Sequence, residues 1–164
     1  MHMVYSTDDL SIENLKYFQY WDKVKERFPR LRLTAFVVAE GLPVKEFEEW
    51  FELRKDWVTI GVHCFNHSRV QEGWREDQGI WIAAALAILK PYLPKRFLYR
   101  PPGFRFLPKT EKILKDSGFA GIAHQEFIKY FDTLEKVRVF NTHCTFDQFH
   151  NPIGQIWSKI NVSI

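Results

Sequence analysis

The sequence has few cysteines, since only Cys64 and Cys144 occur in 164 residues. Two cysteines do not make a disulfide framework, and small secreted domains that depend on disulfides carry more. The first residues also lack a charged start followed by an apolar stretch, which is the pattern of a secretion signal. We therefore expect a cytoplasmic protein with reduced cysteines.

Long apolar runs and long basic runs are also missing. No apolar run approaches the roughly 18–20 residues that a helix needs to span a bilayer. The longest, GIWIAAALAIL at residues 79–89, fits a buried helix. Lys and Arg are scattered, and the net charge is only +3. We therefore expect no membrane span and no nucleic-acid partner; the sequence does not indicate the oligomeric state.

Apolar and aromatic residues are plentiful, at 46% and 16% of the chain, so a sizeable core can form. The length fits one domain covering residues 1–164. Runs rich in β-branched and aromatic residues predict strands at 3–6, 31–39, 57–65, 96–100, 119–124 and 137–144. Helical spacing and end signals predict helices at 11–28, 43–54, 78–93, 108–118 and 154–160. This alternation predicts an α/β fold with a parallel sheet or barrel and outer helices.

Polar clusters accompany the ends of four predicted strands. They are STDD at 6–9, HCFNH at 63–67, RPPG at 100–103 and NTHC at 141–144. In a parallel barrel the carboxyl ends of the strands share one rim, where chemistry gathers. Acids, histidines and an arginine at one rim are what a metal-assisted hydrolytic site requires.

The histidine pair alone leaves two interpretations open. In an extended chain the Cα atoms of His63 and His67 would lie about 13 Å apart, too far to share a zinc ion. A turn over residues 64–66 would bring the two Cβ atoms within about 5–6 Å. Shared metal binding therefore requires the strand to end close to His63. Otherwise the pair is two polar residues at an ordinary strand end.

A carboxylate is the natural third ligand beside two histidines. Asp8 and Asp9 each offer one, and adjacent residues of a strand point to opposite sides. One aspartate can therefore face a metal while the other faces a substrate. The alternative is that this pair caps the helix that follows.

Taken together and in this order, the clusters resemble the motifs of the polysaccharide deacetylase family, also called the NodB-homology domain or carbohydrate esterase family four. The family's TFDD motif is similar to STDD at 6–9, and its H-[ST]-x-x-H-[ST] motif to HCFNHS at 63–68. Its R-x-P motif is similar to RPPGF at 100–104, and its late histidine motif to FNTHC at 140–144. The run LTAFVV at 33–38 also resembles a family strand. The resemblance implies a distorted, trimmed (β/α) barrel with about six or seven mostly parallel strands and outer helices.

The resemblance also implies a metal and a substrate. Asp9, His63 and His67 would hold a divalent metal, with Zn²⁺ expected first and Co²⁺, Mn²⁺ or Ni²⁺ as alternatives. The implied activity is a metal-dependent carbohydrate deacetylase, which removes acetyl groups from N-acetylated or O-acetylated sugars or polysaccharide. The expected partner is therefore an acetylated carbohydrate substrate.

Three further residues receive catalytic roles from the resemblance. Asp8 would act as the general base on water, and Arg100 would pair with Asp8 and keep it ionised. His143 would protonate the departing amine. From the residues alone, Arg100 can equally pair with a surface acid, and His143 can be an ordinary buried histidine.

The chain also departs from the family pattern. Leu10 replaces a glycine, and Cys64 replaces a serine or threonine. The aspartate-tryptophan motif that precedes the last strand has no clear counterpart, and Asp132 is a weak substitute. Two alternatives therefore stay open: a hydrolase of the same fold that cleaves another C–N bond, such as a cyclic amide or ureide, and a non-catalytic protein that binds metal or glycan.

Overall fold

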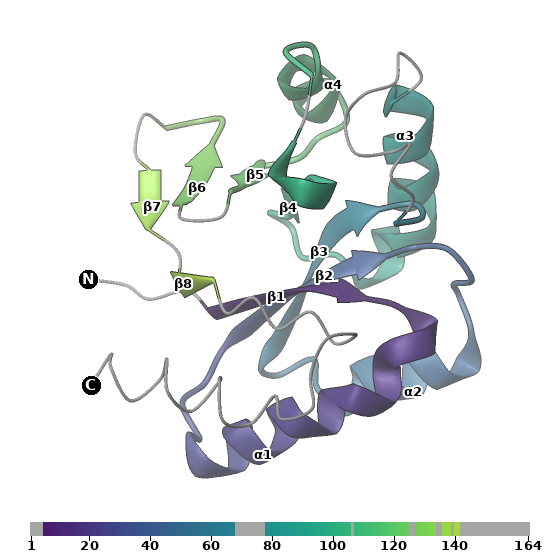
Figure 1. Ribbon diagram of the computed structural model, residues 1–164, viewed down its shortest axis with the longest axis vertical. Helices are drawn as coiled ribbons and strands as arrows, with labels where there is room; N and C mark the ends of the chain where they lie inside the picture. Colours follow the sequence, from purple (N-terminus) through teal and green to yellow (C-terminus); the bar gives the residue numbers. More distant parts are fainter. Residues whose placement is uncertain are drawn as a thin grey trace.

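A computed structural model describes residues 5–67, 78–105, 107–124, 127–133, 136–138 and 140–141. Within these residues the strands form one curled sheet in the order β7-β6-β5-β4-β3-β2-β1-β8 (Figure 1). The strands are β1 (Tyr5–Leu10), β2 (Leu33–Val38), β3 (Val58–Cys64), β4 (Leu98–Tyr99), β5 (Gly121–Ala123), β6 (Phe127–Tyr130), β7 (Lys136–Arg138) and β8 (Phe140–Asn141). Neighbours from β8 to β5 are parallel, whereas β6 and β7 continue the sheet antiparallel. The predicted α/β class with a mostly parallel, trimmed barrel-like sheet is confirmed.

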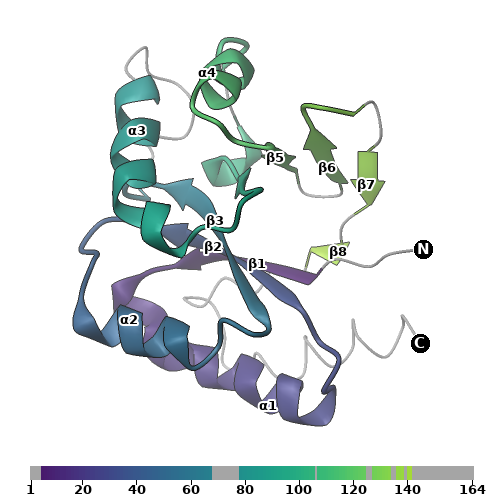
Figure 2. The same ribbon diagram turned by 180° about the vertical axis from the view of Figure 1, so that it is seen from behind.

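The helices lie on the outside of the sheet, as expected. They are η1 (Ile12–Phe18), α1 (Gln19–Arg27), α2 (Lys45–Glu52), α3 (Gln78–Leu89), η3 (Lys90–Tyr92), η4 (Pro102–Phe104) and α4 (Thr110–Asp116). In both views α1 and α2 run below β1 and β2, and α3 stands beside β3 (Figures 1 and 2). Among the described residues no helix has the length and apolar content to cross a bilayer. The helix predicted at 154–160 lies outside the described residues.

The two faces of the sheet differ in chemistry because strand residues alternate. One set of alternate positions in β2 and β3 belongs to the main apolar core, which also includes Trp21 and Phe47 from the helices. That set is Leu33, Ala35, Val37, Val58, Ile60 and Val62. The positions between them place Phe36, Gly61 and His63 on the other face. The helix-covered face is therefore apolar, and the opposite face carries the polar residues.

Strand β1 is longer than predicted. It continues through both aspartates to Leu10, which is fully buried and pairs with Val37 of β2. The register of that pairing shifts between Thr7 and Leu10, and Asp9 has a φ of 59°. The two aspartates therefore lie at a bulge in β1, and Leu10 beyond them returns to the apolar core.

The far end of the sheet was predicted less well. Strand β6 was not expected, since Ile128 is its only buried residue and its signal is weak. The single strand expected at 137–144 is instead two short strands, β7 and β8. Strand β8 lies beside β1, with Asn141 opposite Ser6. His143 and Cys144 lie outside the described residues.

Candidate metal centre

The bulge in β1 separates the two neighbouring aspartates. Asp9 adopts a left-handed backbone conformation, which Asp tolerates better than most residues. Asn14 of η1 fixes this turn, because its amide donates to the carbonyl oxygen of Asp9 at 2.5 Å and accepts from the Ser11 N–H at 2.8 Å. Ser11 is also the N-cap residue of η1, so the aspartates do not cap it. Bulges re-aim side chains in this way, leaving the Asp9 carboxylate free to point elsewhere than that of Asp8.

The histidine pair has the turn that shared binding requires. Strand β3 ends at Cys64, and the chain bends at Phe65 and Asn66. Two backbone hydrogen bonds hold this bend against the loop after β2, from Ala39 N to Cys64 O at 3.0 Å and from Glu40 N to Phe65 O at 2.7 Å. The ring centroids of His63 and His67 consequently lie 5.1 Å apart.

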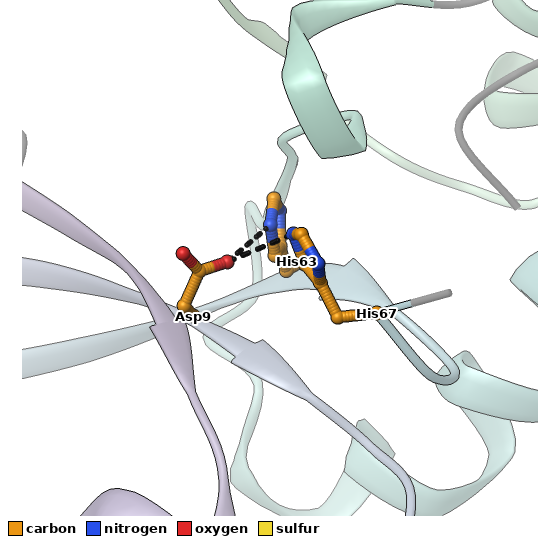
Figure 3. A group of neighbouring side chains, drawn as sticks. All are labelled: Asp9, His63 and His67. Carbon is orange, nitrogen blue, oxygen red and sulfur yellow. Dashed lines mark hydrogen bonds and ion pairs between the residues drawn. The ribbon is translucent and has the colours of Figure 1, made fainter. Parts of the chain in front are cut away.

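Asp9, His63 and His67 converge on one point (Figure 3). Oδ1 of Asp9 lies 3.0 Å from Nε2 of His63 and 3.0 Å from Nε2 of His67. The three candidate ligand atoms all lie within 4.8 Å of one another. The side chain of His63 is 3% exposed and that of His67 is 40% exposed, so the cluster opens to solvent on one side.

The donor chemistry of this cluster fits a divalent metal. Nδ1 of His63 lies 2.7 Å from the carbonyl oxygen of Arg100, which can only accept a hydrogen bond. A neutral His63 therefore carries its proton on Nδ1 and turns the lone pair of Nε2 toward the Asp9 carboxylate. Two acceptors 3.0 Å apart require a proton or a cation between them. A carbonyl that fixes a histidine through its other nitrogen is also the usual support of a metal ligand.

The charge state of Asp9 suits the same role. Burial acts to raise the pKa of Asp9, but hydrogen bonds from His63 and His67, and the positive charge of these imidazoles when they are protonated, outweigh it and hold the pKa well below its ordinary value. The carboxylate is therefore ionised at neutral pH. Two imidazoles and one carboxylate are a ligand set that zinc and other first-row divalent metals accept.

Asp8 lies apart from this cluster and faces Arg100. Nη1 of Arg100 is 3.6 Å from Oδ2 of Asp8, and its Nη2 donates to Oγ of Ser6 at 2.8 Å. Arg100 is fully buried and Asp8 is 5% exposed. Burial lowers the pKa of Arg100 to about 10, while the charge of Asp8 opposes the change, so Arg100 stays protonated at neutral pH. The arginine therefore does not pair with a surface acid.

A pocket of about 600 Å³ adjoins the cluster. Asp9 and His67 form part of its wall. The rest of its lining is Ser11, Ile12, Glu13, Asn14, Val38, Glu40, Gly41 and Asn66. This volume lies within the range of small-molecule sites, which is about 300–1,000 Å³. The candidate ligands are thus reached from a space that can hold a sugar ring.

Other candidate residues lie elsewhere. Asp132 is a surface residue that pairs with Arg96 at 2.9 Å, so nothing described ties it to a catalytic histidine. Cys64 is buried, and desolvation raises the pKa of its thiol, as expected for a packing residue. The sequence did not single out Asn14, which fixes the turn at Asp9, or Phe36, whose ring packs against Gly61 of β3. A glycine inside a strand indicates that another group approaches the backbone closely, so Gly61 was a usable signal for Phe36.

Comparisons with known proteins rest on structure, because no family model and no curated protein matches the sequence. A carbohydrate esterase family four pseudoenzyme from Bacillus anthracis matches with a TM-score of 0.63 and 11% identity over 98% of this chain and 60% of that chain. A family 4 carbohydrate esterase from Streptomyces lividans, in complex with acetate, matches with a TM-score of 0.64 and 13% identity over 99% of this chain and 88% of that chain.

A third match is a family 4 acetyl xylan esterase from Clostridium thermocellum in complex with a cobalt ion. Its TM-score is 0.52, with 21% identity over 68% of this chain and 53% of that chain. The chain thus spans less than two thirds of the pseudoenzyme and of the xylan esterase. At these identities the matches speak to the fold. This chain has the NodB-like fold of the carbohydrate esterase family four structures.

Proposed function

We propose that this chain is a metal-dependent hydrolase that removes acetyl groups from N-acetylated or O-acetylated sugars. The observation that carries the proposal is the convergence of Asp9, His63 and His67 beside the buried Asp8–Arg100 pair. The solved structures support it, because one similar esterase holds cobalt and another holds acetate. A metal site and a separate ionised carboxylate are the two elements that hydrolysis of an acetyl group needs.

Each residue has a role in this proposal. Asp9, His63 and His67 would hold one divalent ion, with zinc expected first; such an ion polarises an acetyl carbonyl and lowers the pKa of water. Asp8 accepts the proton of the attacking water, and Arg100 pairs with Asp8 at 3.6 Å. Oδ1 of Asp8 is buried without a hydrogen-bond partner among the described residues, so its capacity to accept a proton is not used by the part of the chain that the structure describes. His143 would donate a proton to the departing amine or alcohol.

The adjoining pocket would receive the sugar. Ile12 and Val38 offer apolar contact, and Asn14 and Asn66 offer groups that bond hydroxyls. Its described lining contains no Lys or Arg, so we expect neutral sugars to bind better than anionic ones.

Acetate release tests the proposal. The purified protein, loaded with Zn²⁺ or Co²⁺, should release acetate from acetylated chito-oligomers or acetylated xylan, and a chelator should abolish the release. Asp8→Asn should lose at least about 100-fold in rate, because a general base contributes about 10²–10⁴-fold. It should keep its metal, since Asp8 is not among the clustered ligands. Ring opening of a cyclic amide or ureide without acetate release would favour the other C–N hydrolase.

A non-catalytic metal-binding protein is the second candidate. Two observations favour it: Asp132 is engaged at the surface with Arg96, and one similar structure is a pseudoenzyme. In this case the protein would bind one metal ion per chain through Asp9, His63 and His67 but release no acetate from acetylated chito-oligomers or acetylated xylan.

A further inference from the structure

An aromatic ring lies under the guanidinium of Arg100. Cζ of Arg100 is 4.1 Å from the centroid of the Phe36 ring, and both side chains are almost fully buried. The face of an aromatic ring attracts a cation, more strongly where water is excluded. The guanidinium is planar, so contact with a ring face restricts its tilt as well as its position.

The ring can lie there because the residue opposite has no side chain. Phe36 of β2 is the Cα partner of Gly61 on β3. A Cβ added to Gly61 would come within 2.6 Å of Cε1 and 2.7 Å of Cδ1 of the Phe36 ring. Real Cβ atoms do not approach so closely, so the ring occupies the space that any side chain at 61 would need. The Phe36 ring therefore packs directly against the backbone of Gly61.

Arg100 connects the Phe36 ring to the residues of the site. Its side chain reaches Ser6 and Asp8 on β1, and its carbonyl oxygen accepts from Nδ1 of His63. Its backbone N–H donates to Val62 O at 2.9 Å, which anchors the residue to β3. The backbone of Arg100 is thus fixed by the sheet. The direction of its guanidinium depends on the side chains that contact it, which include Phe36, Ser6 and Asp8.

We propose that Phe36, packed against Gly61, is a positioning residue for Arg100 and, through Arg100, for Asp8. The idea that Asp8 is a base rests on the proposed function; the placement of Arg100 does not. Phe36 is neither a candidate metal ligand nor part of the pocket lining. Its loss should therefore alter the turnover step and leave metal and substrate binding almost unchanged.

The first experiment needs no activity. NMR of the Arg100 side chain, assigned with Arg100→Lys, should show a guanidinium signal shifted by the ring current of Phe36. Phe36→Leu should remove most of the shift, leaving the smaller contribution of the Phe104 ring, whose centroid is 5.8 Å from Cζ of Arg100. Gly61→Ala should change the shift by displacing the Phe36 ring. Phe47→Leu is the matched control, because Phe47 is equally buried but contacts Trp50 and Tyr92 in the helix layer. A shift that stays at its wild-type size in Phe36→Leu would overturn the proposal.

The second experiment compares kcat with KM at saturating Zn²⁺. Phe36→Leu and Gly61→Ala should lower kcat for acetate release about 10- to 100-fold, since small misplacements of a reacting group cost this much. KM and the metal Kd should stay within about twofold of the wild-type values, and Phe47→Leu should change kcat by less than about twofold. Equal losses of kcat in Phe36→Leu and Phe47→Leu would indicate a structural role and refute positioning. If the wild type releases no acetate, the proposed function fails, and the NMR shift alone decides whether Phe36 places Arg100.

Discussion

The two faces of the sheet have opposite designs. The helix-covered face holds a continuous apolar cluster to which α1, α2, α3 and α4 contribute, with Trp21 and Phe47 fully buried in it. On the other face the apolar cluster has three buried members among the described residues, Phe36, Ala123 and Ile128, and a buried charge lies against it. Burial of apolar area is the main source of stability, whereas a buried ion pair contributes little or nothing net. The comparison indicates that one face stabilises the fold and the other sets the chemistry.

The largest effect should come from the helix-covered face. Trp21→Ala removes a fully buried ring from α1, and such truncations cost about 3–5 kcal/mol of unfolding free energy. Urea unfolding of the metal-free protein measures it. Metal affinity of the folded variant should be unchanged, because Trp21 lies on the opposite side of the sheet from His63. A large loss of metal affinity in the folded protein would show that the two faces are not separable.

On the other face the largest effect should come from Arg100→Met. The substitution leaves the buried Asp8 without its cation, and removing one partner of a buried pair costs about 3–5 kcal/mol. We expect a value of about 3 kcal/mol, at the lower end of this range. The double variant Arg100→Met with Asp8→Asn should recover much of the loss in urea unfolding. If the single variant were as stable as wild type, the pair would not be a coupled unit.

Metal should stabilise the protein through the three clustered side chains, Asp9, His63 and His67. With Zn²⁺ at 100 times its Kd, the unfolding free energy should rise by about 2.7 kcal/mol. Asp9→Ala should abolish this gain because it removes the carboxylate shared by both histidines. Asp132→Ala is the control and should keep the gain, since Asp132 is engaged with Arg96. Unfolding curves with and without a chelator measure both; an equal gain in Asp9→Ala would exclude the cluster as the metal site.

The sequence predicted β2 and β3 because both depend on local patterns, and it offered the turn after His63 as one of two alternatives. The β-branched runs mark β2 and β3, and Asn66 permits the bend that brings His67 back to His63. The left-handed backbone conformation of Asp9 was not predictable, because it depends on the side chain of Asn14 in η1.

The ring beneath Arg100 was not predictable for a related reason. Phe36 and Gly61 meet only because β2 and β3 pair in one register, and Arg100 arrives from a third strand. A pattern within one strand cannot specify which residue of another strand lies opposite. Local propensity therefore gives the elements and the candidate ligands, whereas non-local register gives their supports.

The smallest effect should come from the position that stands in for the missing family motif. Asp132 is 55% exposed on its side chain, and its ion pair with Arg96 is itself exposed. Exposed pairs contribute about 0–1 kcal/mol, so Asp132→Asn should change unfolding free energy by less than about 1 kcal/mol. Acetate release should also stay within about twofold of wild type, because Asp132 is held at the surface by Arg96. A rate loss of about tenfold or more, about 1.4 kcal/mol in activation free energy, would instead place Asp132 in the site. The polar face would then extend to the strand β6 end of the sheet, and its contrast with the helix-covered face would have to be redrawn there.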